Sequence, residues 1–152
     1  MTAVLAVSRA TDWNFPLFVH VLGAMTLVGG LLTATSLLGF ARGDTRLLRL
    51  GYWTLLAVAL PGYVVMRVGA EWLYRKEDLD ALPDEPTWID IGYGVADVGA
   101  LFVLIALILG GIGVRRLRYG KGTGLLKATM AIALIVLAAA VVAVWAMSGK
   151  PN

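Results

Sequence analysis

The chain has 152 residues, of which 59% are hydrophobic and 15% charged, and its mean hydropathy is +0.81. A water-soluble domain of this length cannot bury so much apolar surface, so the composition indicates an integral membrane protein. The absence of cysteine excludes disulfides, thiolate metal sites and catalytic thiols. The net charge of +3 comes from cations in short loops beside hydrophobic segments, so we expect no nucleic acid partner.

Four stretches are long and apolar enough for spanning helices, which need roughly 20 mostly apolar residues each. They predict an all-α fold, an integral membrane four-helix bundle in which residues 1–152 form a single transmembrane domain. The predicted helices cover about residues 16–40, 52–74, 88–114 and 125–147. Asp12 or Asn14 can cap the first helix, and Pro16 suits its first turn. Because the residues before it lack a basic start and a long apolar run, we expect no cleaved signal peptide.

The second predicted helix is the least apolar of the four. It carries Pro61-Gly62 near its middle, where we expect a packing kink, and then Arg67 and Glu71. The third helix contains Asp90 and Asp97, whereas the fourth has no ionisable side chain beyond Lys127, which we count with the basic loop before it. We therefore interpret the fourth helix as a scaffold or packing face.

The loop charges predict the orientation of the bundle. The loop after the first helix holds three arginines against one acid, and the loop after the third holds cations and no acid. The second loop, YRKEDLDALPDEPTW, is acidic. Both basic loops are therefore expected in the cytoplasm, with both termini extracytoplasmic, in a multi-pass protein of the inner or plasma membrane. The expected outer aromatic belt consists of Trp13, Trp72, Tyr74, Trp88 and Trp145.

Apart from Lys127 at the start of the fourth helix, five His, Arg, Asp or Glu residues lie inside predicted spans, where a charge costs roughly 2.5 to 3.5 kcal/mol at a helix centre on insertion scales. They come from three helices, and the predicted orientation places all of them in the outer half of the bilayer. We take them as the candidate ligand- or ion-binding site: His20, Arg67, Glu71, Asp90 and Asp97. An outer cluster of this kind predicts binding or relay of a proton, a cation or a small ligand.

Arg67 and Asp97 are the deepest charges, and we expect them to pair, with Glu71 as a second acceptor for the guanidinium. One arginine against three acids leaves two excess negative charges. Protonated His20, protonation of a carboxyl group, a bound cation, or exposure of Asp90 and Glu71 to water would each neutralise them. The alternative is that Glu71 and Asp90 are solvated near the interface and that Arg67 and Asp97 form a purely structural clamp.

His20 is the only histidine, so it is the candidate metal ligand, and a pair of histidine axial ligands to haem is excluded within one chain. A haem would need a methionine, a vacant position or His20 of another protomer as the second ligand. The alternative is a histidine that is hydrogen-bonded inside the bundle.

A Gly-Gly pair precedes each basic loop, at Gly29-Gly30 and at Gly110-Gly111. Since each loop also leads into a further helix, this repetition hints at two similar helical hairpins.

The string HVLGAMTLVGG, from His20 to Gly30, resembles the opening helix of a bacterial family of predicted integral membrane proteins of unknown function. That family lies distantly near the copper-resistance D and membrane protoporphyrinogen-oxidase families. PGYVVMRVGAEW, WIDIGYGVADVG and VRRLR extend the resemblance to an actinobacterial-type member over most of the chain. The resemblance implies a four-helix membrane protein with a histidine in its outer half, and haem or copper as the cofactors of its distant relatives.

No phosphate-binding loop, nucleophile elbow, zinc spacing or dinucleotide fingerprint is present, so we do not expect an enzyme. Besides the binding hypothesis, two alternatives remain. One is a non-catalytic accessory or assembly subunit of a membrane complex, and the other is a redox protein linked to haem or quinone. The expected partners are the lipid bilayer and either a second copy of the chain or another membrane subunit.

Overall fold

The computed structural model describes residues 14–76 and 87–149, and every regular element in these ranges is a helix. The elements are α1 (Asn14–Phe40), α2 (Thr45–Thr54), η2 (Leu55–Ala59), α3 (Leu60–Lys76), α4 (Thr87–Arg116), η4 (Leu117–Tyr119) and α5 (Thr123–Gly149). Within the described ranges, four helical segments are long and apolar enough to cross a membrane, and the least hydrophobic of them is the second, as predicted. The all-α four-helix fold is therefore confirmed.

The second span begins earlier than predicted, at Thr45 instead of near residue 52. A carboxylate oxygen of Asp44 accepts a hydrogen bond from the backbone N–H of Arg46 at 2.8 Å, which caps the first turn of α2. Arg46 and Arg49, assigned to a loop from the sequence, consequently lie on this helix. At the first helix, Asn14 is already helical, while Asp12 and Trp13 lie outside the described residues.

A π-helical turn precedes Pro61. The turn covers Leu55–Ala59, and the backbone N–H of Leu60 donates to the carbonyl of Leu55. Proline has no N–H, and its ring crowds the carbonyl four residues earlier, so a wider turn just before it relieves both problems. A wide turn thus lies just before Pro61-Gly62, where a packing kink was predicted, and the helical segment Thr45–Lys76 is continuous through it.

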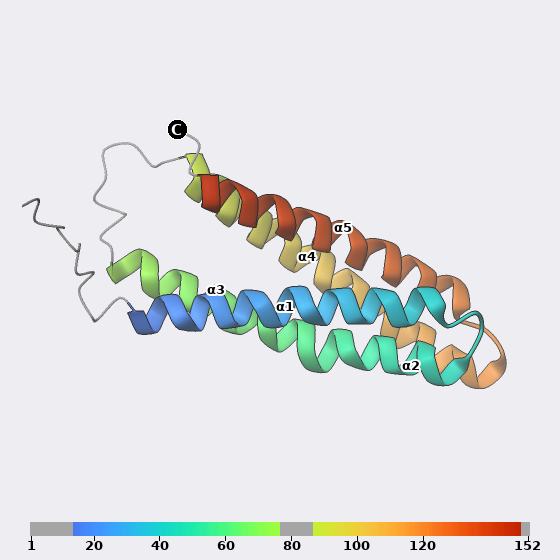
Figure 1. Ribbon diagram of the computed structural model, residues 1–152. Coiled ribbons are helices and arrows are strands. Elements are labelled where there is room, and N and C mark those ends of the chain that lie inside the picture. Colours follow the sequence, from blue (N-terminus) through green and yellow to red (C-terminus); the bar gives the residue numbers. More distant parts are fainter. Residues whose placement is uncertain (1–13, 77–86, 150–152) are drawn as a thin grey trace, which may run out of the picture.

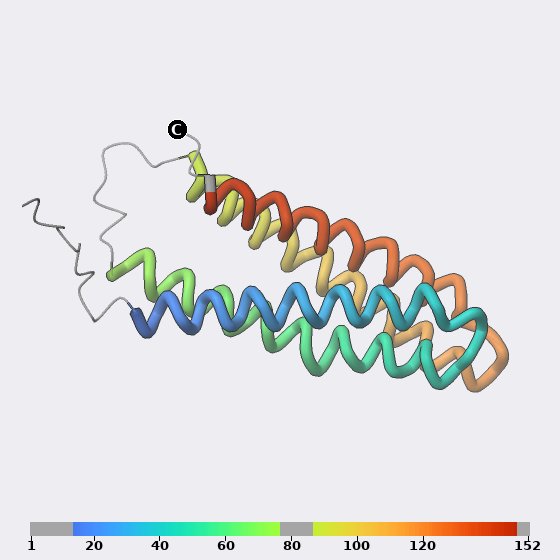
Figure 2. The backbone as a smooth tube through the Cα atoms, viewed as in Figure 1, coloured from blue at the N-terminus to red at the C-terminus, as the bar shows by residue number. Residues whose placement is uncertain are grey.

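The four spans form two antiparallel hairpins (Figure 1). α1 packs along α3 and α4 packs along α5, whereas α3 and α4 touch little. The hairpins meet closely at the end that holds the turns before α2 and before α5, which we call the closed end. They diverge toward the other end, where α3 ends and α4 begins (Figure 2). We call this second end the open end.

Glycines bring α1 and α3 into backbone contact. Gly23 and Gly30 on α1, and Gly62 and Gly69 on α3, are each spaced by seven residues, which keeps them on one helix face. A Cβ atom added at Gly62 would lie 3.0 Å from the Cα atom of Leu27 on α1, and one added at Gly30 would lie 2.9 Å from the Cα atom of Ala59 in η2. Such close backbone approach is typical of packed membrane helices.

The buried core occupies the middle and the closed end of the bundle. Its central cluster consists of Leu27, Leu31, Ala34, Leu55, Ala59, Val103, Ala106, Ala133 and Val136. A second cluster at the closed end consists of Leu38, Ala41, Leu48, Leu117 and Leu126. Outside the core, each span exposes large apolar side chains, which is the surface expected toward lipid.

The two Gly-Gly pairs have different packing roles. Gly30 meets Ala59 within the first hairpin, while Gly110 receives the ring of Tyr52 from the other hairpin. The described structure therefore contains two hairpins, as the repetition hinted, but their glycine pairs are not used in equivalent contacts. Whether the hairpins arose by duplication stays a hypothesis.

Candidate functional site

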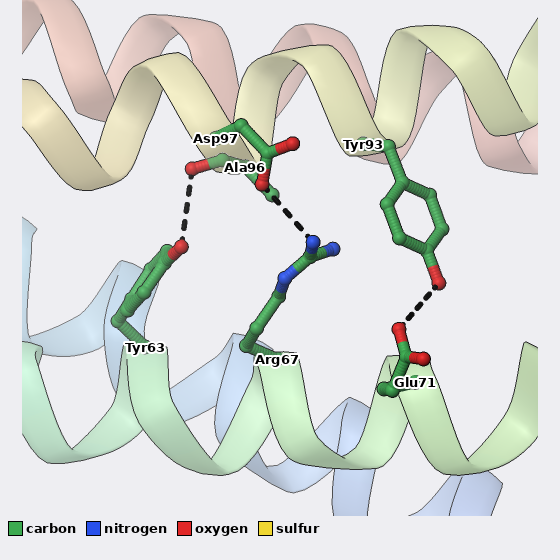
Figure 3. Close-up of polar contacts among 6 residues, drawn as sticks. All are labelled: Tyr63, Arg67, Glu71, Tyr93, Ala96 and Asp97. Atoms are coloured by element: carbon green, nitrogen blue, oxygen red, sulfur yellow. Dashed lines mark hydrogen bonds and ion pairs between the residues drawn. The ribbon is translucent and has the colours of Figure 1, made fainter.

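Polar side chains join α3 to α4 across the diverging hairpins (Figure 3). The guanidinium of Arg67 lies 3.0 Å from a carboxylate oxygen of Asp97, which is the pairing predicted from the sequence. One helical turn deeper on α3, the hydroxyl of Tyr63 donates to the carbonyl of Ala96 at 3.2 Å. We call the polar contacts between the two helices the α3–α4 bridge; its residues are Tyr63, Arg67, Glu71, Tyr93, Ala96 and Asp97.

Glu71 completes the α3–α4 bridge in a different way from that predicted. It accepts a hydrogen bond from the hydroxyl of Tyr93 at 3.4 Å, and its cationic partner is Arg75 at 3.2 Å. Arg67 instead places its guanidinium carbon 4.4 Å from the centre of the Tyr93 ring, a cation–π contact. The expectation that Glu71 would be a second acceptor for Arg67 was therefore wrong, because the neighbouring turn of α3 supplies a closer cation.

The charges of the α3–α4 bridge balance only together with Arg75, the cationic partner of Glu71. Arg67 faces Asp97, and Arg75 faces Glu71. Asp90 is exposed in the first turn of α4, where a carboxylate is favoured by the positive end of the helix. Counting Arg75, which was assigned to the loop, reduces the negative excess inferred from the sequence from two charges to one, and the remaining charge is that of the exposed Asp90. The described cluster needs no bound cation for neutrality.

The α3–α4 bridge lies on the outside of the bundle. The side chain of Asp97 is 64% exposed and that of Arg67 is 30% exposed. Arg67 is nine residues from the end of α3 and Asp97 ten from the start of α4, or about 14 and 15 Å along each helix. The two groups therefore meet at the same depth and tie the hairpins together below the open end.

A cavity of about 770 Å³ lies between the hairpins toward the open end. All four spans contribute to its walls, which are mostly apolar. A smaller space of about 100 Å³ continues deeper and shares several of the same residues. The residues that line both are His20, Ala24, Val28, Ala70, Tyr93, Val144 and Met147. We call the two spaces together the interhairpin cavity.

His20 is the candidate site residue on the wall of this cavity. Its Nδ1 atom lies 3.0 Å from the backbone carbonyl oxygen of Met66. The close approach of the helices explains this contact, because Gly69 packs directly against the backbone of His20. The histidine is therefore hydrogen-bonded inside the bundle and also lines the cavity, so the two readings of this residue from the sequence are compatible.

The five candidate residues therefore do not form one cluster. Arg67, Glu71 and Asp97 belong to the α3–α4 bridge, His20 belongs chiefly to the cavity, and Asp90 lies apart on the surface. Arg67 links the two regions, since it also lines the smaller space. The single layered cluster expected from depth alone is thus divided between two sides of the bundle.

Coordination of a metal or haem iron in the cavity would involve the Nε2 atom of His20, because Nδ1 is already engaged. Met25 and Met147 line the larger space, and Met66 and Met147 line the smaller one. Among the described residues, no group of three or more histidine, aspartate or glutamate side chains is placed to hold a metal ion.

Comparisons with protein-family models, curated proteins and solved structures found no match to this chain. The resemblance drawn from the HVLGAMTLVGG string therefore stays a prediction.

Tyr63 and Tyr93 were not among the site residues predicted from the sequence. A signal was available, because Tyr63, Arg67 and Glu71 repeat every four residues on one face of α3, and Tyr93 precedes Asp97 by four on α4. The interhairpin cavity had no such signal, because it depends on the angle between the hairpins.

Proposed function

We propose that this multi-pass membrane protein binds a small lipid-soluble ligand in the interhairpin cavity, with His20 as the polar contact. The observation that carries the proposal is a cavity of about 770 Å³ with mainly apolar walls and a histidine on them. Ligand pockets commonly have this size and this combination of apolar lining with few polar groups. Of the three candidates suggested by the sequence, a proton, a cation and a small ligand, we therefore choose the small ligand.

A proton relay is a weaker candidate, given the order of groups in the α3–α4 bridge. The guanidinium of Arg67 stands between Asp97 and the Tyr93–Glu71 contact. Because arginine does not release its proton in proteins, it interrupts any chain of proton transfer between the two carboxylates. A cation site is also weaker, since each of these carboxylates already faces an arginine.

The proposal includes the orientation inferred from the loop charges, with the closed end in the cytoplasm. The cations at that end support it: Arg42, Arg46, Arg49, Arg115, Arg116, Arg118, Lys121 and Lys127. In this orientation the interhairpin cavity lies in the outer leaflet of the inner or plasma membrane. The accessory-subunit and redox alternatives stay hypotheses, and an absorption spectrum with a Soret band would favour the haem form.

Photolabelling tests the proposal. The full chain is placed in phosphatidylcholine nanodiscs with a single-chain amphiphile that carries a diazirine in its chain, and labelled residues are mapped by mass spectrometry. We expect saturable labelling at Val144 and Met147, which line the cavity. Ala24→Phe places a ring in the cavity and should reduce this labelling at least severalfold.

Leu22→Phe is the matched control, because Leu22 is exposed on the same helix and lines neither part of the cavity. It should leave the labelling at Val144 unchanged. Labelling that is spread evenly over lipid-facing residues, and that is equal in Ala24→Phe and Leu22→Phe, would contradict ligand binding in the cavity.

A further inference from the structure

The hydrogen bond of His20 determines what the cavity offers to a ligand. The carbonyl oxygen of Met66 only accepts hydrogen bonds, so the Nδ1 atom 3.0 Å away must carry the hydrogen. In the neutral imidazole, Nε2 then has a free lone pair and accepts. The contact with Met66 therefore sets one tautomer and directs hydrogen-bond acceptance to Nε2.

Nε2 is accessible from the cavity. Nε2 has no hydrogen-bond partner within residues 14–76 and 87–149. In the same residues, every fully buried side-chain nitrogen or oxygen has a partner. Nε2 is therefore not fully buried, and because His20 lines both parts of the interhairpin cavity, we take the open space at Nε2 to be this cavity. The site thus presents an acceptor to its ligand.

The cavity opens sideways between α1 and α5. The lining residues Val21 and Met25 on α1 are 44% and 69% exposed, and Val144 on α5 is 54% exposed. On the opposite side, the α3–α4 bridge connects the hairpins (Figure 3). In a bilayer the open side is apolar and faces acyl chains, so a ligand with a hydrocarbon chain can enter from the membrane.

The described lining disfavours charged head groups. No acidic side chain lines either part of the cavity within the described residues, so an ammonium head would lack a partner. Arg67 lines the smaller part but is paired with Asp97, so a carboxylate head would have to compete for it. Aromatic side chains are present instead, with Tyr74, Trp88 and Tyr93 on the walls. A neutral aromatic head can contact their rings favourably.

We infer that the ligand is a long-chain phenol or hydroquinone whose hydroxyl donates to Nε2 of His20 while its chain leaves between α1 and α5. This inference rests on the proposed function and adds the class of the ligand to it. A phenolic hydroxyl supplies the hydrogen that Nε2 lacks, the ring meets the aromatic wall, and the alkyl chain meets the exposed lining of α1 and α5.

Competition against the photolabel tests the head group. A diazirine-bearing 4-alkylphenol is the probe, and the competitors are the unlabelled 4-alkylphenol and its methyl ether, which has the same chain but no donor. Because one hydrogen bond contributes modestly in net terms, we expect the phenol to compete about 2- to 10-fold better than the ether. In His20→Phe the two competitors should become equal while labelling at Val144 persists.

His20→Gln provides a second variant if His20→Phe folds poorly, because its amide can donate toward Met66 and still accept from the phenol. It should restore part of the preference for the phenol. Equal competition by phenol and ether in the unaltered protein, with labelling still reduced by Ala24→Phe, would overturn the head-group inference and leave the proposed function standing. A preference that survives in His20→Phe would overturn the assignment to Nε2. Failure of Ala24→Phe to reduce labelling would instead overturn the proposed function.

Discussion

Asp97 Oδ1 lies 3.0 Å from the guanidinium of Arg67, and this ion pair joins α4 to α3 where the two helices otherwise touch little. A charge left alone at this depth in a membrane span is costly, so each partner makes the other tolerable. The pair therefore contributes to the arrangement of the hairpins as well as to the charge balance of the α3–α4 bridge.

Removing one charge of this pair should destabilise the protein. We expect Asp97→Asn or Arg67→Gln to lower the free energy of unfolding by about 2 to 3 kcal/mol, because an unpaired charge remains in the span. The double variant should lose less than the sum of the two single losses. Denaturant unfolding in detergent micelles measures all three values.

Arg75→Gln is the control, since Arg75 forms an exposed i,i+4 pair with Glu71. This variant should lower the free energy of unfolding by less than about 0.5 kcal/mol. Strictly additive losses would contradict the coupling of Arg67 with Asp97.

The close contact of α1 with η2 predicts different responses from two adjacent glycines. A Cβ atom in Gly30→Ala would lie 2.9 Å from the Cα atom of Ala59, so the helices would have to move apart. We expect a loss of about 1 to 3 kcal/mol in the free energy of unfolding. In Gly29→Ala the new Cβ meets nothing within 4 Å, so this variant should be at least as stable as the parent. Equal melting temperatures for the two variants would contradict this packing.

A buried hydroxyl joins α5 to α4. The side chain of Thr129 lies 3.3 Å from the carbonyl of Ala106, besides its bond to Leu125 in its own helix. Thr129→Val keeps the shape and removes the donor, so we expect it to lower the free energy of unfolding by about 0.5 to 1.5 kcal/mol. Thr33→Val is the matched control, because the exposed hydroxyl of Thr33 bonds within its own helix. A loss in Thr33→Val as large as that in Thr129→Val would argue against an interhelical role.

The absence of cysteine makes the orientation directly measurable. Thr87→Cys and Thr123→Cys place single thiols at the first residues of α4 and α5, both exposed and at opposite ends of the bundle. With the closed end in the cytoplasm, a membrane-impermeant maleimide should label Thr87→Cys in intact cells. It should label Thr123→Cys only after permeabilisation. The reverse pattern would show that the charge-based orientation is inverted.

The sequence by itself determined the four apolar spans, because each needs only local length and hydrophobicity to satisfy its backbone inside a bilayer. It also determined the pairing of Arg67 with Asp97, because two opposite charges at similar depth in a bilayer each cost less free energy when they are paired. Pairing within α3 was less visible, because Arg75 was read as part of the loop and Glu71 was therefore assigned to Arg67.

Only the tertiary structure decided how His20 and the cavity are arranged. The carbonyl of Met66 reaches His20 because Gly69 lets α3 approach the backbone of α1, which depends on contacts between distant segments. The interhairpin cavity exists because the hairpins join at the closed end and diverge at the open end. An angle between hairpins results from the sum of many side-chain contacts, so hydrophobic periodicity along one helix cannot specify it.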